Sequence, residues 1–261
     1  MAEQLLRIDT PAEGVRYLTL DDPATRNALG DQLLDELLAA LESARDDETV
    51  RVVVITSSHE RIFSSGGNLK AFDDARPLAE KFAGLDRFPR LFTLIGALGK
   101  PVICAANGDV LAGAFGLALA CDLVLAKASA KFGCPEINVG VFPFMISALI
   151  YRNIDRMKAN ELMMTGALVT AAEGAAIGFV NRVVADDEFD AAVLVWAEQV
   201  ASKSPLLMRL GKQAINATRD MALGEALSTL QAQLALAFAT EDMREGVAAF
   251  REKRDPTWTL R

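Results

Sequence analysis

The sequence predicts an α/β fold that is followed by a region of helices alone. Over residues 1–190, short runs of β-branched and apolar residues alternate with segments whose apolar residues recur at helical spacing. This alternation indicates parallel strands covered by helices, because a helix between two strands lets them run side by side in the same direction. From Phe189 onward only the helical pattern remains. We therefore expect an α/β core over 1–190 and a helical region over 191–261.

The expected elements of the core follow from apolar runs, turn residues and capping residues. Strands are predicted at residues 5–8, 15–20, 50–55, 101–106, 123–126 and 179–184. Helices are predicted at residues 31–44, 79–98, from 113 onward and at 155–165. Asp31 is expected to cap the first helix and Gly166 to end the last one. Thr170 and Glu173 form the pattern of a capping box, which marks the start of a further helix.

The helical region is predicted to hold successive helices at residues 189–202, 205–218, 222–240 and 242–253. An apolar stripe runs along the third of these helices and consists of Leu227, Leu230, Leu234 and Phe238. An apolar helix face is stable when another surface covers it. The stripe should therefore bury either against the core or against another subunit.

The composition excludes several classes of function. The 261 residues carry a net charge of −8, which argues against nucleic acid or an anionic membrane as the main partner. The N-terminus lacks the basic segment of a targeting sequence, and the most apolar run, at 110–121, is too short to span a bilayer. We expect a cytoplasmic protein. Its cysteines, Cys104, Cys121 and Cys134, lack C-x-x-C spacing and should be reduced thiols of the core.

The single histidine, His59, limits the possible chemistry further. One histidine excludes metal sites built from several histidines, and it excludes Ser-His-Asp catalysis unless His59 itself is the base. Because His59 stands in a polar stretch, we expect an exposed imidazole in a loop. No metal site is predicted.

Three segments could carry chemistry, although each has a structural alternative. Residues 63–70 follow a strand and contain paired glycines whose N–H groups can face a ligand, or they form an ordinary glycine turn. Residues 107–118 open a helix near Gly113, where the helix dipole favours negative charge, or their small side chains serve close helix packing. Residues 131–143 place Glu136 among apolar residues and prolines. Burial there would raise the pKa of the carboxyl towards a value useful for proton transfer; the alternative is a structural glutamate paired with an arginine or a backbone N–H.

Taken together, these segments resemble the enoyl-CoA hydratase/isomerase family, also called the crotonase superfamily. The resemblance extends to Arg26-Asn27-Ala28-Leu29 before the first helix and to the stretch from Glu245 to Arg254 near the C-terminus. Each motif alone is weak. Taken together, in the same order and over nearly the whole chain, these motifs make a specific match.

The resemblance implies a crotonase-like spiral of ββα units with a C-terminal helical trimerisation region, and hence a homo-trimer or a dimer of trimers. Gly67 and Gly113 match the two oxyanion-hole positions, and Glu136 matches a catalytic glutamate. The substrate would be an acyl-CoA thioester, with no metal or redox cofactor. The positions implied in CoA binding are Arg26, Ala28, Ser65, Gly66, Asn68, Leu69 and Lys70, with Phe250 and Lys253 closing over the ligand, sometimes from a neighbouring subunit.

The chain departs from the family pattern at one position. Family hydratases carry a second glutamate three residues after the second oxyanion glycine, where this chain has Gly116. The pair of glutamates holds and activates a water, so its loss favours a Δ3-Δ2 enoyl-CoA isomerase-like reaction or a weak hydratase, with Glu136 as the single proton shuttle. Asp73 or Asp74 could replace the missing acid, or they could equally form a solvated helix start.

Two further interpretations stay open at this point. Residues 144–147 stand where the family often has Gly-Ala-Gly-Gly, so the acyl pocket should be reshaped. A catalytically idle homologue that only binds acyl-CoA is the alternative to an enzyme, because a fold does not guarantee an activity.

Overall fold

A computed structural model describes residues 4–68, 77 and 85–261, and the strands of its core form two sheets. The larger sheet has the strand order β1-β2-β3-β5-β7-β10. Only β1 and β2 pair antiparallel, and the other neighbours in this sheet run parallel. Its strands are β1 (Leu6–Ala12), β2 (Val15–Leu20), β3 (Val52–Ser57), β5 (Val102–Ala106), β7 (Leu123–Lys127) and β10 (Arg182–Val184). The predicted α/β class with parallel pairing is confirmed.

The second sheet consists of short strands that the periodicity of the sequence does not predict. They are β4 (Ile62–Ser64), β6 (Asp109–Leu111), β8 (Lys131–Gly133) and β9 (Leu168–Thr170). β4, β6 and β8 run parallel to one another, and β9 pairs antiparallel with β8. The carboxyl ends of the three parallel strands therefore meet at one edge of this sheet.

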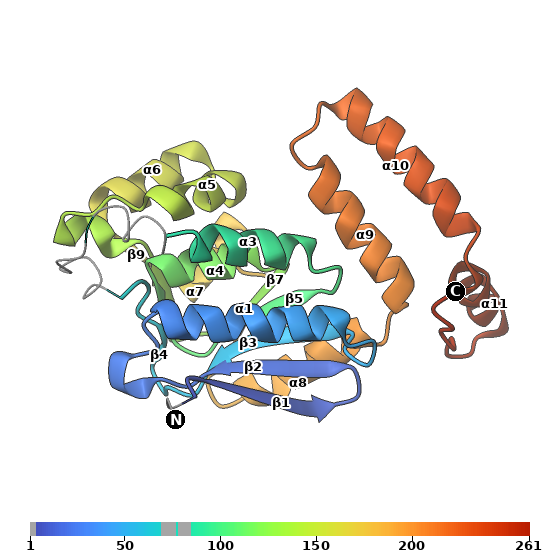
Figure 1. The fold of residues 1–261 in the computed structure, drawn as a ribbon, viewed down its shortest axis with the longest axis horizontal. Helices are drawn as coiled ribbons and strands as arrows, with labels where there is room; N and C mark the ends of the chain where they lie inside the picture. The colour runs from blue at the N-terminus through green and yellow to red at the C-terminus, as the bar shows by residue number, and fades with distance from the viewer. Residues whose placement is uncertain (1–3, 69–76, 78–84) are drawn as a thin grey trace.

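Helices cover both faces of the larger sheet (Figure 1). The helix α1 (Asp31–Asp46) buries its predicted leucine face in the same cluster as Val53 and Ile55 of β3. Alternate residues of β3, Val52 and Val54, lie in a second cluster with α8 (Phe189–Ala201). Side chains of successive strand residues point to opposite faces, so a strand buried on both faces reads as a continuous apolar run.

The ends of several elements differ from the sequence prediction. Gly30, and not Asp31, is the N-cap of α1, and no side chain caps this end; Asp31 is the first helical residue and lies 3.6 Å from Arg87 Nη1. The strand predicted at 179–184 is shorter, and the structure has a helix over residues 144–153 that was not predicted. Helices with short or locally apolar sequences have weak periodic signals.

Apart from α5, the remaining helices largely follow the predicted positions, and residues 79–84 of the helix predicted at 79–98 lie outside the described residues. The remaining helices are α3 (Arg87–Ala97), α4 (Gly113–Ala120), α5 (Phe144–Asn153), α6 (Arg156–Thr165), α7 (Ala171–Ile177), α9 (Pro205–Thr218), α10 (Leu223–Phe238) and α11 (Glu241–Glu252). Gly166 ends α6 in the left-handed region at φ 65°, as predicted. The capping box of α7 is also confirmed: the Glu173 N–H donates to Thr170 Oγ1 at 3.2 Å, and the Thr170 N–H donates to Glu173 Oε2 at 2.7 Å.

His59 is less exposed than predicted, and the three cysteines are free thiols. His59 lies in a loop but is half-buried, so the predicted exposed imidazole is wrong; its Nδ1 accepts the N–H groups of Arg61 and Ile62, both at 3.2 Å. Cys104, Cys121 and Cys134 are free thiols, with Cys121 only half-buried. In the part of the chain that the structure describes, no helix is long and apolar enough to cross a membrane.

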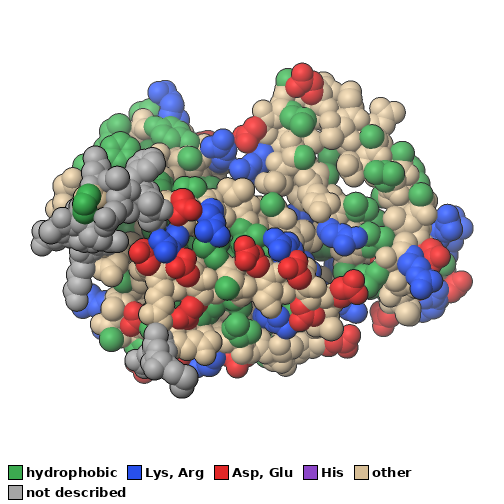
Figure 2. Space-filling model, viewed as in Figure 1, with side chains coloured by type: hydrophobic (Ala, Val, Ile, Leu, Met, Phe, Trp, Pro, Cys, Tyr) green, Lys and Arg blue, Asp and Glu red, His purple; other side chains and the backbone are tan. Residues whose placement is uncertain are grey.

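The C-terminal helices α9, α10 and α11 extend away from the core as an arm (Figure 1). None of the α10 residues is buried in the single chain. The predicted stripe is exposed, with Leu227 at 58%, Leu234 at 54% and Phe238 at 55%. Figure 2 shows apolar side chains on the surface of this arm. The stripe is therefore not covered by the chain's own core, which leaves another subunit as its predicted cover.

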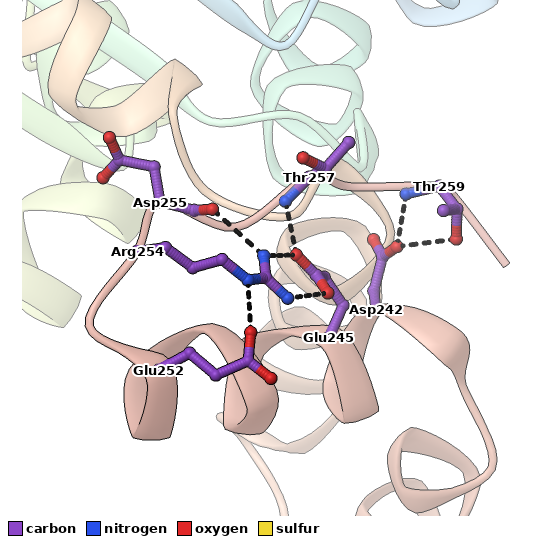
Figure 3. A network of polar contacts seen from close by, with 7 residues as sticks. All are labelled: Asp242, Glu245, Glu252, Arg254, Asp255, Thr257 and Thr259. Carbon is purple, nitrogen blue, oxygen red and sulfur yellow. Dashed lines mark hydrogen bonds and ion pairs between the residues drawn. The ribbon is translucent and has the colours of Figure 1, made fainter.

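A polar network folds the C-terminal tail back onto α11 (Figure 3). Asp242 is fully buried and accepts hydrogen bonds from the Ser204 hydroxyl, from the Thr259 N–H at 2.7 Å and from the Leu260 N–H at 3.1 Å. Glu245 accepts from the Arg254 guanidinium, which also pairs with Glu252. This network links α11 both to the tail and to the start of α9.

Asp242→Ala should destabilise the protein markedly, because it leaves two backbone N–H groups and the Ser204 hydroxyl without their buried acceptor. We expect a loss of about 3 kcal/mol in the free energy of unfolding, which lowers Tm by roughly 6–12 °C in a chain of this size. Thermal unfolding of Asp242→Ala beside Asp255→Ala, a substitution of an exposed tail aspartate, checks this. Equal Tm values for the two variants would contradict the role of the network.

Candidate active site

The three groups singled out for catalysis all follow the carboxyl ends of parallel strands in the second sheet. Gly67 comes shortly after β4, Gly113 shortly after β6, and Glu136 shortly after β8. The paired register of these strands, Ser64 with Val110 and Leu111 with Gly133, sets the three segments side by side. The short strands that sequence patterns missed are therefore the elements that position the candidate site.

The segments carrying Gly67 and Gly113 are in close contact. A Cβ on Gly66, which has φ +88°, would lie 2.4 Å from Ala112 Cβ and 2.6 Å from the Leu111 carbonyl oxygen, so only glycine fits there. A Cβ on Gly113 would lie 3.5 Å from the Gly67 nitrogen. The two glycine backbones are thus neighbours, as an oxyanion hole requires.

The N–H groups of Gly67 and Gly113 have no acceptor among residues 4–68, 77 and 85–261. Gly113 is the first residue of α4, where the N-terminal N–H groups and the helix dipole favour negative charge. The preceding Ala112 has φ 54° and ψ −128°, and its own N–H donates to Gly133 at 2.9 Å. This arrangement can stabilise an oxygen that gains negative charge.

Glu136 lies in a short 3-10 helix (Pro135–Val139) beside these glycines. Its Oε2 atom is buried and has no hydrogen-bond partner in the described structure. Burial raises the pKa of the Glu136 carboxyl, because the charged form loses its hydration. The alternative reading of Glu136, as a structural residue paired with an arginine or a backbone N–H, is therefore not supported at its Oε2 atom. With this oxygen unpaired, the carboxyl is suited to exchanging a proton with a ligand.

A cavity of about 460 Å³ joins these groups. It is lined by Ser65, Gly67, Leu85, Phe88, Ala112, Gly113, Pro135, Glu136, Asn138, Val139, Val141, Phe142, Pro143, Phe144, Met145 and Ile146. Most of this lining is apolar, and Glu136 is its only ionisable side chain within the described residues. Another cavity, of about 510 Å³, lies between α4, α5 and α9 and contains none of the predicted site residues.

Gly116, where family hydratases have their second glutamate, is buried and tightly packed. A Cβ at this position would lie 2.3 Å from Ile146 Cγ2 and 3.1 Å from Phe92 Cζ. The missing acid is thus replaced by the side chain of Ile146. Residues 144–147, which are predicted to reshape the pocket, include three that line the cavity: Phe144, Met145 and Ile146.

The loop at residues 26–29 lies against the segment at residues 65–67, as the predicted CoA cradle requires. The Ser65 N–H donates to the Arg26 carbonyl at 3.0 Å, and the Leu29 N–H donates to the Gly66 carbonyl at 2.7 Å. Arg26 and Asn27 both have left-handed backbones, at φ 59° and 53°. The buried Asn27 amide holds this turn by donating to Ser57 Oγ at 2.6 Å and to the Phe63 carbonyl at 3.0 Å.

The structure brings together only some of the predicted CoA-binding residues. Ala28 is half-buried beside the cradle, and Asn68 lies near Gly30. Leu69 and Lys70 lie outside the described residues, as do Asp73 and Asp74.

Phe250 and Lys253 are not near the cavity of their own chain. Phe250 is 85% exposed on α11, and Lys253 is the left-handed residue that ends this helix. Figure 1 places α11 at the opposite end of the molecule from α5, which lines the cavity. Within one chain, these two residues cannot close over a ligand in that cavity.

Sequence reasoning missed the aromatic residues of α3. Phe88 lines the cavity and would lie 2.9 Å from a Cβ on Gly113, and Phe92 packs beside Gly116. These residues belong to a helix whose other face, with Leu91 and Ile95, is fully buried. The sequence signal that could have identified them is the i,i+4 spacing of Phe88 and Phe92 beside the apolar face of the predicted helix.

This chain is similar in fold to solved structures and in sequence to known proteins over nearly its whole length. An enoyl-CoA hydratase from Mycobacterium smegmatis superposes with a TM-score of 0.94 at 31% identity, over 98% of this chain and 99% of that one. A 2,3-dehydroadipyl-CoA hydratase of Escherichia coli is 35% identical over 93% of this chain and 94% of its own length. A crotonyl-CoA hydratase of Syntrophomonas wolfei is 34% identical over 93% of each chain.

The chain also matches the family described as enoyl-CoA hydratase/isomerase over residues 10–261. It therefore belongs to the enoyl-CoA hydratase/isomerase family, and its fold is the crotonase fold.

Proposed function

We propose that this acyl-CoA enzyme moves the double bond of a 3-enoyl thioester to C2, with Glu136 as the single proton carrier and Gly67 and Gly113 as oxyanion-hole donors. The observation that carries the proposal is the unpartnered, buried Oε2 of Glu136 in a cavity that also contains the two glycines. A carboxylate held in this way is poised for proton exchange with a bound ligand.

In the proposed reaction, Glu136 removes a proton from C2 of the substrate. The electron pair of that C–H bond enters the thioester, and negative charge gathers on the carbonyl oxygen of the resulting dienolate. The N–H groups of Gly67 and Gly113 stabilise this charge, and the largely apolar lining strengthens their interaction with it. Glu136 then returns the proton to C4, which leaves the double bond between C2 and C3.

Hydration of a 2-enoyl thioester is the second candidate reaction, because relatives in Escherichia coli and Syntrophomonas wolfei are named as hydratases. That reaction needs a water activated for attack at C3 in addition to a proton for C2. Among the described lining residues, Glu136 is the only carboxylate. We therefore propose that hydration is the weaker of the two activities.

A direct assay offers the purified enzyme crotonyl-CoA and a 3-enoyl-CoA at equal concentration. Faster isomerisation than hydration is the expected result, and fast hydration without isomerisation would reject the proposal.

Exchange of solvent deuterium into C2 of bound acyl-CoA tests the alternative that the protein is a catalytically idle homologue that only binds acyl-CoA. Absence of exchange and of turnover with every chain length would favour that alternative.

We propose further that the protein assembles as a homo-trimer or a dimer of trimers. The exposed apolar stripe of α10 supports this, because an exposed apolar helix face of this extent marks a protein–protein contact. Light scattering at micromolar concentration should give a mass of three or six chains of 28.0 kDa. A monomer mass would contradict the assembly.

Phe250 and Lys253 would then reach a neighbouring chain's cavity, since they lie far from their own. Lys253→Glu should weaken CoA binding by roughly tenfold, because a cation facing a phosphate becomes an anion. Calorimetric titration of CoA measures this, with Lys203→Glu, an equal charge change at an exposed loop residue, as the control. Equal affinity of the two variants would show that Lys253 does not contact the ligand.

A further inference from the structure

The side chain of Ile146 occupies the space beside Gly116. An ideal Cβ on Gly116 would lie 2.3 Å from Ile146 Cγ2 and 3.0 Å from Ile146 Cβ. Ile146 is only 4% exposed, yet it lines the same cavity as Gly113 and Glu136. The α5 helix thus inserts a branched apolar side chain into the wall of the candidate active site.

The place that Ile146 fills is defined by the geometry of α4. Residue 116 stands one turn after Gly113 on this helix, so both residues lie on the same helix face. A side chain from position 116 would therefore start at the cavity wall that Ile146 now covers. Phe92, 3.1 Å from the same Cβ position, closes the remaining space.

An apolar wall at this point determines where water can be held. An ordered water in a buried site needs two to four polar partners. The methyl groups of Ile146 and the ring of Phe92 offer none. From the described residues that meet this position, a water placed here for attack on the substrate would gain neither an orienting acid nor a hydrogen-bond acceptor.

We propose that Ile146 is a reaction-specificity residue, which fills the space beside Gly116 and keeps attacking water away from the acyl group. A proton taken up by Glu136 then returns to a substrate carbon, and no hydroxyl group adds. This inference rests on the proposed function and names the residue that separates isomerisation from hydration in this chain.

The test compares the ratio of hydration to isomerisation in variants of the full-length enzyme. A ratio of two rates on one sample cancels differences in the fraction of folded protein. Gly116→Glu alone should not raise the ratio, because Ile146 and Phe92 occupy the space that the new side chain needs. Gly116→Glu combined with Ile146→Ala should raise it roughly tenfold or more, since a second carboxylate can then hold water opposite Glu136.

Ile150→Ala provides the matched control. Ile150 is fully buried on the same helix one turn later but does not line the cavity. The Ile150→Ala variant should leave the ratio of hydration to isomerisation unchanged, while Ile146→Ala should raise this ratio severalfold by admitting water. Either of two results would overturn the role of Ile146. One is a double variant that still isomerises with an unchanged ratio, and the other is an equal effect of Ile146→Ala and Ile150→Ala on that ratio. A wild-type enzyme that never isomerises would instead reject the proposed function itself.

Discussion

Glu136→Gln should lower the rate of 3-enoyl-CoA isomerisation by roughly 10²–10⁴-fold, the usual contribution of a positioned acid-base group. Glutamine keeps the shape of the side chain but cannot take or return a proton. The affinity for acyl-CoA should change little, because the apolar lining and the CoA cradle are intact. Steady-state kinetics together with equilibrium binding separate the two quantities, and fast turnover by the variant would remove Glu136 from the mechanism.

The same substitution should stabilise the protein at neutral pH. Because burial raises the pKa of Glu136 in the folded state, ionising it there costs more than ionising it in the unfolded chain. This cost is absent below pH 4.5, the ordinary value, where the carboxyl is neutral in both states. It grows as the pH rises through the folded-state pKa. Tm of Glu136→Gln should thus exceed that of the wild type at neutral pH and equal it in acid.

The pH dependence of the reaction follows from the same shift. Glu136 must be ionised in order to remove the first proton, so kcat/KM should fall as the pH drops through its raised pKa. The acid limb of the pH profile should lie above pH 4.5. A profile that stays flat down to that pH would contradict the proposed base.

Gly67→Pro should lower kcat by roughly 10²–10³-fold, the usual cost of removing one oxyanion-hole donor. Proline lacks the N–H and places a ring carbon where the hydrogen stood. Gly67→Ala is the matched control, because no atom lies within 4 Å of the position of its Cβ and its φ is not in the left-handed region. The alanine variant retains the N–H and should keep most of the activity.

Circular dichroism of both Gly67 variants checks that they fold. If folded Gly67→Pro and Gly67→Ala lost activity equally, the added bulk would account for the loss, and the N–H would have no special role. Full activity of the proline variant would exclude Gly67 as a donor.

Much of the larger sheet and of the helices around it could be predicted from the sequence. Residues 33–41 repeat leucine at helical spacing, and the strand at 52–57 is a continuous β-branched and apolar run, so each element has an unambiguous period. The capping box at Thr170 is a local hydrogen-bond pattern and needs no tertiary information. Asp31 was a wrong choice of cap because aspartate is also favourable in the first turn of a helix.

The second sheet could not be predicted in the same way. Its strands, such as Lys131–Gly133, have three residues each, which is too short to establish an alternating pattern. They exist because distant segments pair with one another. The catalytic candidates were found through motifs rather than periodicity, and the filling of the Gly116 position by Ile146 is a contact between two helices that no local pattern encodes.

The arrangement of the second sheet also indicates where the chain can be lengthened without harm. The loops that leave β4, β6 and β8 fix the mutual positions of Gly67, Gly113 and Glu136, so an inserted residue there would pull the three apart. The loops that enter two of these strands are different: Ser58 and Glu60 before β4, and Ala128 and Ser129 before β8, are exposed. Peptide tags or reporter labels inserted at these entering loops would be carried on the surface at the opposite edge of the sheet from the cavity.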